Sequence, residues 1–400
     1  MKLRPTPYVW VSFAMIVGVM GTALISPLYG LYRDAWDLKP SDVSMIYVVY
    51  MFGALCGLLT LGRLADRLGF RPVMTGSLVL VLVGTLISLA APDLAVLSVG
   101  RFIVGVASSM MTTSATVGLT ALSPFGRPQR AAVMAGLLMA VGFGLGPLLG
   151  GIMGQWAPAP LVTTYVPTLV LGALGLWALR RVPLPAEGGG PSRRLHWRDL
   201  LPHLTWPEAS ASSTFLLTCI LPFLVFGVFG LYAAMSPLFL DKLVPRHGPV
   251  VSGTAIALIL FMSAAVQNLV SHMKTYRCGS RGMAVLVLSN ALLMVNLFVG
   301  SGLLFVIGVV CTSIGHGMGS VAGMSVVTRI AGPHNRSGLV ATFLLVGYIG
   351  SMLPMMAMGW IADHWGLPVA VCAFCSMVIV LGTVVGVLFH RHPRIRAVAG

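Results

Sequence analysis

The most informative stretch of the chain reads GRLADRLGFRP, residues 62–72, and lies between the apolar runs 43–62 and 72–91. Four of its eleven side chains are charged, whereas neither run contains Asp, Glu, Lys or Arg. A helix of about 20 apolar residues is long enough to cross the hydrocarbon core of a bilayer. The stretch therefore predicts a short charged loop between two membrane-spanning helices.

The same pattern extends over the whole chain of 400 residues, of which 57% are hydrophobic and 9% are charged. A soluble domain carries about 25% charged residues, because its surface must be in contact with water. Apolar runs bounded by Pro, Gly and charged residues predict twelve spanning helices. Their expected ranges are 8–32, 43–62, 72–91, 94–120, 130–155, 162–179, 212–239, 250–271, 282–300, 302–328, 337–360 and 367–389.

The longest polar stretch, residues 180–207, divides these helices into two sets of six. It contains the sequence EGGGP followed by two arginines, which is typical of a flexible basic linker. The segments that precede the fifth and eleventh helices also have similar sequences, and each of these helices contains a proline. We therefore expect an all-α membrane protein with two pseudo-symmetric six-helix bundles, 1–179 and 210–400, joined by a cytoplasmic linker, 180–209.

Lys and Arg residues are distributed unevenly about the predicted spans. With the N-terminus in the cytoplasm, 20 of them fall in cytoplasmic segments, 4 fall in outer loops, and Arg101 lies inside a span. Such an excess marks the cytoplasmic side of a membrane protein. We expect a multi-pass protein of the cytoplasmic (inner) membrane with both termini in the cytoplasm.

Several functional classes lack support in the sequence. The basic residues behind the net charge of +15 form no basic face or domain, so no nucleic-acid partner is expected. Cys372 and Cys375 form a C-x-x-C inside a predicted helix with no second pair, which favours neither a metal nor a redox site. No H-E-x-x-H motif, Walker loop or carboxylate cluster is present, so we expect no enzyme, no cofactor and no ATP-driven transport. A membrane receptor or scaffold remains an alternative to a transporter.

The charged loop carries a recognisable pattern. Gly62, Asp66, Arg67, Gly69 and Arg71 match G-x-x-x-D-R-x-G-x-R, which resembles the loop signature of the major facilitator superfamily. A glycine permits a tight turn, and an acid can meet the positive N-terminal end of a helix. The resemblance implies a twelve-helix transporter fold in which this cluster latches the two halves together on the cytoplasmic side. The corresponding loop of the second half lacks the acid, so any latch there should be weaker.

The fifth predicted helix contains the glycine-rich sequence GFGLGPLLGG, residues 142–151. Small residues four apart let another helix approach closely in lipid, and a proline bends a helix where its neighbours can bond the freed carbonyl. The sequence is similar to a motif of the proton-driven exporters, the drug:proton antiporter branch, of the same superfamily. The matching residues are Gly142, Gly146, Pro147, Gly150 and Gly151. This resemblance favours an exporter over an importer.

Arg101 is the only Lys or Arg well inside a predicted span, about two turns below the outer end of the fourth helix. An arginine in hydrocarbon is unfavourable unless it faces a cavity and a partner. Together with Gly105 it resembles the Arg-x-x-x-Gly pattern of the superfamily's fourth helix, which implies a role in proton coupling. A structural arginine that bonds carbonyl groups between helices is the alternative.

Carboxylates are absent from the middle of every predicted span, because all ten acids fall at helix ends or in loops. Many proton-coupled drug exporters of the superfamily bear a mid-membrane carboxylate. Two candidate proton acceptors remain: Asp34 at the outer end of the first helix, ranked slightly ahead, and His316 in the tenth helix. An unperturbed imidazole titrates near neutral pH. A histidine that only packs and hydrogen-bonds is the alternative for His316.

Polar and aromatic side chains inside the spans supply the candidate substrate contacts. Tyr29, Tyr232 and Tyr348 fall on helices one, seven and eleven, which line the central cavity in the superfamily. An interfacial aromatic side chain is the alternative for each of them. The predicted substrate-binding set is Tyr29, Tyr32, Arg101, Tyr232, Gln267, His316 and Tyr348.

The sequence thus predicts a secondary active transporter that works by alternating access and exports a small amphipathic organic compound or drug in exchange for protons. Its expected partners are the small-molecule substrate, protons and the lipid bilayer, and its expected state is a monomer. A facilitator, importer or exporter of a small anionic metabolite that uses Arg101 is the main alternative.

Overall fold

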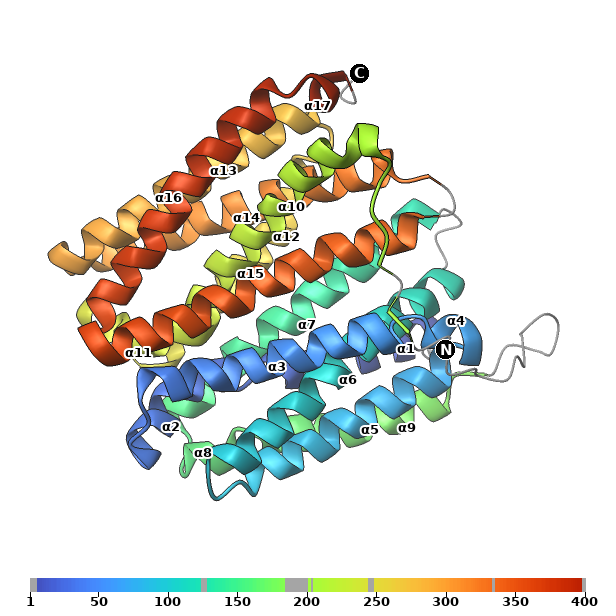
Figure 1. Ribbon diagram of the computed structural model, residues 1–400. Helices are drawn as coiled ribbons and strands as arrows, with labels where there is room; N and C mark the ends of the chain where they lie inside the picture. Colours follow the sequence, from blue (N-terminus) through green and yellow to red (C-terminus); the bar gives the residue numbers. More distant parts are fainter. Residues whose placement is uncertain are drawn as a thin grey trace. The chain divides into compact units, whose positions relative to one another are not determined.

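The structure is a computed structural model of the chain and describes residues 6–123, 128–183, 201–202, 204–243, 248–332 and 335–397 (Figure 1). Within these ranges it consists of helices and their connections, without strands. Most of the predicted linker, residues 184–200 and 203, lies outside the described residues. The helices are α1 (Pro7–Ala23), η1 (Ser26–Leu28), α2 (Tyr29–Trp36), α3 (Pro40–Leu61), α4 (Leu64–Leu68), α5 (Phe70–Leu89), α6 (Leu94–Ala121), α7 (Pro128–Trp156), α8 (Pro160–Thr163), α9 (Val166–Arg180), α10 (Ala209–Gly230), η3 (Leu231–Met235), α11 (Ser236–Leu243), α12 (Pro249–Leu269), α13 (Thr275–Val299), α14 (Gly302–Ile330), α15 (Arg336–Trp365), α16 (Leu367–Arg391) and α17 (Pro393–Ala397).

Among the described residues, twelve helical segments are long and apolar enough to cross a membrane. Three of them combine shorter helices: Pro7–Trp36, Pro160–Arg180 and Ala209–Leu240. The prediction of an all-helical membrane protein with twelve spans is therefore confirmed.

One predicted boundary was wrong by two turns. The ninth span begins at Thr275 rather than at residue 282, because the segment that contains Arg277 and Arg281 is also helical. Charged side chains mark where the apolar run ends, but the backbone continues to satisfy its own hydrogen bonds as a helix beyond that point. The helix therefore extends past its apolar run.

The first and seventh spans are interrupted where the sequence predicted continuous helices. A short 3₁₀ turn, η1, contains Pro27, and a π-helical turn, η3, directly precedes Ser236 and Pro237. Proline lacks the N–H group that a regular helix needs, so the backbone nearby adopts tighter or wider turns. The two interruptions lie in corresponding spans of the two halves of the sequence.

Clustering of contacts divides the chain into two compact units: unit 1 holds Met1–Ile25 and Val49–Pro202, and unit 2 holds Ser26–Val48 and His203–Gly400. In unit 1, α1 packs against α6, α7 and α9, and α5 packs against α6. The core between these helices is apolar, with Met15, Met74 and Met111 fully buried.

In unit 2, α10 packs against α14 and α15, and α13 packs against α14 and α16. Residues 26–48 also belong to this unit, and two polar contacts join them to α15. The backbone N–H of Ser41 donates to Oδ1 of Asp363 at 3.1 Å. The hydroxyl groups of Tyr47 and Ser351 lie 2.6 Å apart. The N-terminal part of the second span, α3, is therefore joined to α15 by polar contacts.

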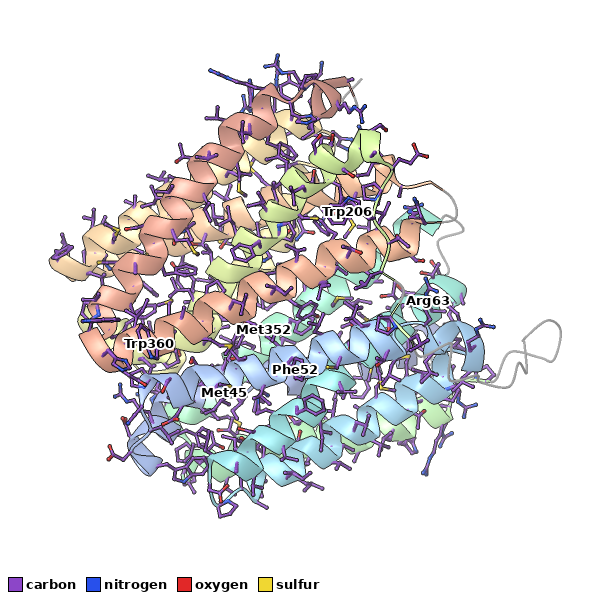
Figure 2. All side chains as sticks on the ribbon, in the orientation of Figure 1. Met45, Phe52, Arg63, Trp206, Met352 and Trp360 are labelled. Atoms are coloured by element: carbon purple, nitrogen blue, oxygen red, sulfur yellow. The ribbon has the colours of Figure 1, made fainter. Side chains whose placement is uncertain are left out.

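Exposed tryptophans lie at both ends of unit 2. Trp206 is 52% exposed beside the start of α10, and Trp360 is 53% exposed near the end of α15. Figure 2 shows these two side chains at opposite ends of the unit. Tryptophan is enriched at both membrane–water interfaces, so this arrangement suits a unit that crosses a bilayer.

Candidate functional site

Arg101 is held in unit 1 by a carbonyl group and an aromatic ring. It lies on α6, is 3% exposed, and donates from Nη1 to the carbonyl oxygen of Thr22 at 3.2 Å. Its guanidinium carbon lies 4.4 Å from the centroid of the Tyr50 ring. The face of an aromatic ring attracts a cation, and this attraction is stronger away from water. These contacts provide the partner that a buried arginine requires.

The surroundings of Arg101 form a small polar network. The Tyr50 hydroxyl donates to Oγ of Ser108 at 3.2 Å, which links α3 to α6. The Nε atom of Arg101 is buried and has no hydrogen-bond partner among the described residues. Buried donors in native proteins are nearly always paired. Arg101 therefore retains one buried donor that could bind an acceptor.

Gly105 lies one helical turn after Arg101, at a position where the structure leaves no space for a side chain. A Cβ atom at Gly105 would overlap the carbonyl oxygen of Tyr50 and lie 2.9 Å from the backbone nitrogen of Ala54. Because Gly105 has no side chain, α3 can lie directly against α6. This close approach brings the ring of Tyr50 over the guanidinium group of Arg101.

A second cluster, in unit 2, centres on His316 of α14. Its Nδ1 atom lies 2.7 Å from Oγ of Ser263 on α12, and Gln267 donates to the same oxygen at 3.3 Å. The imidazole stacks on Phe226 with centroids 6.5 Å apart and lies 5.9 Å from the ring of Phe229. His316 as a whole is half-buried.

Tyr348 completes this group, since its ring meets that of Phe226 edge-on at 6.1 Å. We use the name His316 cluster for six residues: Phe226, Phe229, Ser263, Gln267, His316 and Tyr348. All except Ser263 are half-buried. The structure thus brings together three of the predicted substrate contacts, Gln267, His316 and Tyr348. The cluster combines aromatic faces, hydrogen-bonding groups and one titratable ring.

The sequence analysis missed Phe226 and Phe229. The signal was present, because Phe223, Phe226 and Phe229 recur every third residue along one helix. Such spacing places side chains on neighbouring parts of one helix face. In a chain that is 57% hydrophobic, however, phenylalanines at helical spacing do not distinguish a binding face from a lipid-facing or core face.

The other predicted tyrosines have different surroundings. Tyr29, Tyr32 and Tyr232 are 0%, 2% and 1% exposed. Tyr32 packs on Trp36 with ring centroids 4.9 Å apart, and Tyr232 lies 6.3 Å from Phe305. In the arrangement described here these three rings are packed rather than open, and their role in substrate binding stays a prediction.

Asp34 lies on the exposed end of α2. Its side chain is 66% exposed, and its Oδ1 atom forms a salt bridge with Nη2 of Arg33 at 3.0 Å. Exposed ion pairs of this kind contribute little to stability, because water solvates both partners. The role of Asp34 in proton coupling stays a prediction.

The residues of the charged loop take distinct positions at one end of unit 1. Gly69 has a φ of +85°, a conformation that side chains other than glycine rarely adopt. Asp66 is exposed and Arg67 is half-buried, both on α4, which follows Gly62. Arg71 donates from Nε to the carbonyl oxygen of Leu179 at 3.0 Å, at the C-terminal end of α9. A cation is favourable there because the last carbonyl groups of a helix carry partial negative charge.

The glycine motif of α7 forms the contact with α1. A Cβ atom at Gly142 would lie 3.0 Å from the carbonyl oxygen of Ile16. At Gly146 and Gly150, added Cβ atoms would meet backbone atoms of Met20 and Leu24. Pro147 and Gly151 are buried on the same helix. The small residues therefore allow α1 and α7 to touch backbone to backbone.

No three His, Cys, Asp or Glu side chains in the described parts of the chain gather closely enough to hold a metal ion.

Comparison with protein families gives one broad match. The family model described as Major Facilitator Superfamily matches residues 11–295. Multidrug efflux protein YfmO of Bacillus subtilis is 22% identical over 363 residues, 89% of this chain and 87% of that protein. D-xylose-proton symporter-like 2 of Arabidopsis thaliana is 30% identical over 153 residues, 37% of this chain. A putative multidrug resistance protein MdtD of Pectobacterium atrosepticum is 24% identical over 170 residues, 42% of this chain.

The last two matches span 30% and 36% of the respective relatives' own lengths. Among solved structures, a POT family transporter in complex with 5-aminolevulinic acid is similar with a TM-score of 0.77 and 16% identity. That comparison covers 97% of this chain and 96% of the other. A bacterial homologue of the human lysosomal transporter Spinster is similar with a TM-score of 0.72 and 14% identity, and 96% of each chain is covered. At these low identities, the structural similarities show that the chains share a fold.

Proposed function

The chain belongs to the major facilitator superfamily, and from this premise we propose that it is a secondary active transporter that exports a small amphipathic organic compound in exchange for protons. The His316 cluster carries this proposal. Its aromatic faces suit the apolar part of such a compound, and Gln267 and Tyr348 offer groups that can hydrogen-bond its polar part.

We propose His316 as the proton acceptor. Its Nδ1 atom is engaged with Ser263, and its ring lies against Phe226 and Phe229. A protonated imidazole would be stabilised by these aromatic faces, and so would an organic cation that enters the same space. Two positive charges at one place repel each other, so proton and substrate would displace one another. Mutual displacement at one site is the physical requirement of an antiporter.

The proposed direction, export, rests on different observations. The motif at residues 142–151 resembles that of proton-driven exporters and forms the contact between α1 and α7. The relative YfmO, similar over 89% of this chain, carries the name multidrug efflux protein. We further propose a monomer in the cytoplasmic (inner) membrane with both termini in the cytoplasm, organised as bundles 1–179 and 210–400 with a basic linker, 180–209.

The alternative substrate, a small organic anion, is favoured by one observation. Arg101 has a buried Nε donor with no hydrogen-bond partner among the described residues. A carboxylate could accept from this donor if the helices around Arg101 parted during transport. In the present arrangement Arg101 is 3% exposed and its guanidinium group is covered by Tyr50, which favours a positioning role.

Flux measurements in proteoliposomes test the proposed function. We expect ethidium, an amphipathic aromatic cation, to move several times faster when an inward proton gradient is imposed than when none is present. Lactate flux should be insensitive to the protein. Lactate flux that depends on the protein and is lost in Arg101→Ala, without protein-dependent ethidium flux, would instead establish the anion alternative.

Asp66→Asn should reduce transport strongly while membrane insertion and thermal stability stay unchanged. Asp66 is exposed, so its removal leaves no cavity. Its charge is proposed to fasten the two halves in only one state of the transport cycle. The matched control is Asp37→Asn, because Asp37 is an exposed acid whose left-handed conformation, φ 50°, also suits asparagine. Equal ethidium flux for Asp66→Asn and wild type would exclude the latch role.

A further inference from the structure

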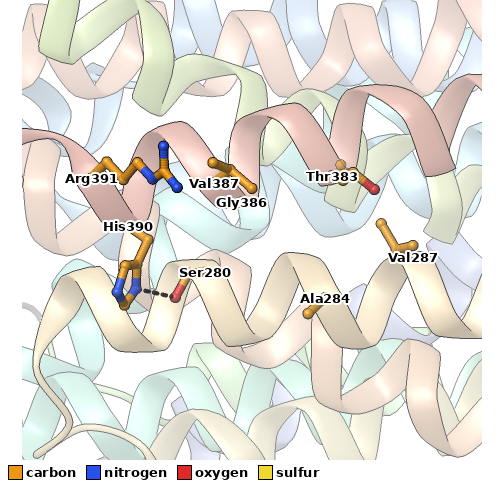
Figure 3. Close-up of a pocket in the computed structure, with 9 residues that line it drawn as sticks. Ser280, Ala284, Val287, Thr383, Gly386, Val387, His390 and Arg391 are labelled. Atoms are coloured by element: carbon orange, nitrogen blue, oxygen red, sulfur yellow. Dashed lines mark hydrogen bonds between the residues drawn. The ribbon is translucent and has the colours of Figure 1, made fainter.

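A groove runs between α13 and α16 on unit 2, and no part of the proposed transport mechanism uses it (Figure 3). Its volume is about 470 Å³. Residues from both helices line it: Ser280, Ala284, Val287, Gly382, Thr383, Gly386, Val387, His390 and Arg391. On α16 the lining extends from Gly382 to Arg391, ten residues that correspond to about 14 Å along the helix axis.

The body of the groove is apolar and is shaped by residues without large side chains. Gly382, Gly386 and Ala284 present little more than backbone and methyl surface, and Val287 and Val387 supply further methyl groups. A Cβ atom at Gly382 would lie 2.8 Å from Cγ2 of Val287. The glycine therefore lets α13 and α16 approach closely at this point. The space for a hydrocarbon chain is the groove itself, which these small residues line.

One end of the groove is polar and basic. His390 points across from α16 to α13, where its Nδ1 atom lies 3.2 Å from Oγ of Ser280 (Figure 3). Arg391 is exposed, and its side chain makes no hydrogen bond or ion pair with any residue that the structure describes. The surrounding helices add more basic residues and contain no Asp or Glu: Arg277 and Arg281 on α13, and Arg394 and Arg396 on α17. This positive charge is not neutralised within these helices.

The surface around the groove is suited to lipid rather than to water. Leu288 on α13 and Val384, Val387 and Leu388 on α16 are 49%, 50%, 47% and 50% exposed. Both helices belong to candidate membrane spans. A molecule that fills the groove must therefore be apolar along its length and carry negative charge at one end. Phospholipids with an anionic headgroup have this distribution of charge.

We propose that this groove binds an anionic phospholipid, with one acyl chain along Gly382, Gly386 and Ala284 and the headgroup phosphate at Arg391. Basic pockets between spanning helices are a known way in which membrane proteins hold anionic headgroups. The basic end lies on the side predicted to be cytoplasmic, so the lipid would come from the inner leaflet. Ser280 and His390 can hydrogen-bond the phosphate oxygens as additional partners.

Arg391 also has a purely local explanation, because a cation in the last turn of a helix interacts favourably with its C-terminal end. That explanation requires no groove and makes no distinction between lipids. It predicts that Arg391→Gln lowers the thermal stability of the lipid-free protein. The lipid site predicts instead that the variant loses preference for anionic lipid. The two readouts can be measured on the same samples.

The experiment is a lipid titration of the purified, detergent-solubilised full chain, with retained lipid counted by native mass spectrometry. The probes are dioleoyl phosphatidylglycerol, dioleoyl phosphatidylcholine and inorganic phosphate. Wild type should retain phosphatidylglycerol several times more tightly than phosphatidylcholine. Arg391→Gln should weaken phosphatidylglycerol binding about fivefold and leave phosphatidylcholine unchanged. Ala284→Phe, which fills the apolar part of the groove without changing charge, should weaken the retention of both lipids.

Arg336→Gln is the matched control, because Arg336 is an exposed cation at the start of α15 that does not line the groove. It should change phosphatidylglycerol binding by less than about twofold. Equal retention of the two lipids by wild type would overturn the proposal, as would equal effects of Arg391→Gln and Arg336→Gln. Displacement of bound phosphatidylglycerol by equimolar inorganic phosphate would also overturn it, because the acyl chain would then contribute nothing. Thr383→Leu provides a second groove-filling variant if Ala284→Phe does not fold.

Discussion

Gly150→Val will sharply reduce the amount of folded protein recovered from the membrane. A Cβ atom at Gly150 would overlap the carbonyl oxygen of Leu24, a backbone atom that cannot move without shifting α1. Overpacking of a tight contact typically destabilises a protein by about 1–3 kcal/mol, and a backbone clash lies at the upper end of this range. We therefore expect the thermal midpoint of any purified variant to fall by roughly 4 °C.

The matched control for this prediction lies on the same helix. Gly136→Val makes the identical chemical change in α7, but a Cβ atom at Gly136 meets no other atom within 4 Å. Expression and midpoint should therefore stay close to those of wild type. If the two variants behave alike, the loss arises from the helix backbone itself, and the close approach of α1 and α7 is not what the motif provides.

The second large effect is expected at His316. His316→Ala should abolish the acceleration of ethidium flux by a proton gradient, because the proposed acceptor is removed. The aromatic rings of Phe226 and Phe229 remain, so ethidium should still bind to the purified variant. The measurement compares gradient-driven flux with binding followed by fluorescence anisotropy.

His364→Ala is the control for this variant. His364 is an exposed histidine on α15 whose Nδ1 atom lies 2.8 Å from the carbonyl oxygen of Trp360. Its replacement should leave gradient-driven flux intact. Asp34→Asn is measured alongside, because Asp34 was the acceptor ranked first from the sequence. If Asp34→Asn loses the gradient effect and His316→Ala keeps it, the proton enters through Asp34 and our assignment to His316 is wrong.

The sequence predicted the membrane fold well, because hydrocarbon imposes a simple length requirement on each span. Charged residues between apolar runs located the loops, and Gly69 in the charged loop indicated the tight turn with a φ of +85°. The positions of charged residues could not predict where a helix begins. The ninth span begins at Thr275, because the backbone is already helical before the apolar run starts.

The candidate site was predicted only in part. His316, Gln267 and Tyr348 stand out in the sequence because polar groups are rare inside spans, and the structure brings them together. Phe226 and Phe229 could not be singled out, since an aromatic ring on a spanning helix can equally face lipid or protein. The contact of Arg101 with Tyr50 depends on how closely two helices approach, which hydrophobic periodicity does not encode.

Proton movement driven by the substrate tests the central claim most directly. Wild-type protein is reconstituted into liposomes that contain a pH-sensitive dye, and an ethidium gradient is imposed with no initial pH difference. We predict that protons move opposite to ethidium, and that the pH change disappears when a protonophore collapses the gradient. Ethidium flux at the full rate with no proton movement, or with protons moving in the same direction, would contradict proton-coupled export.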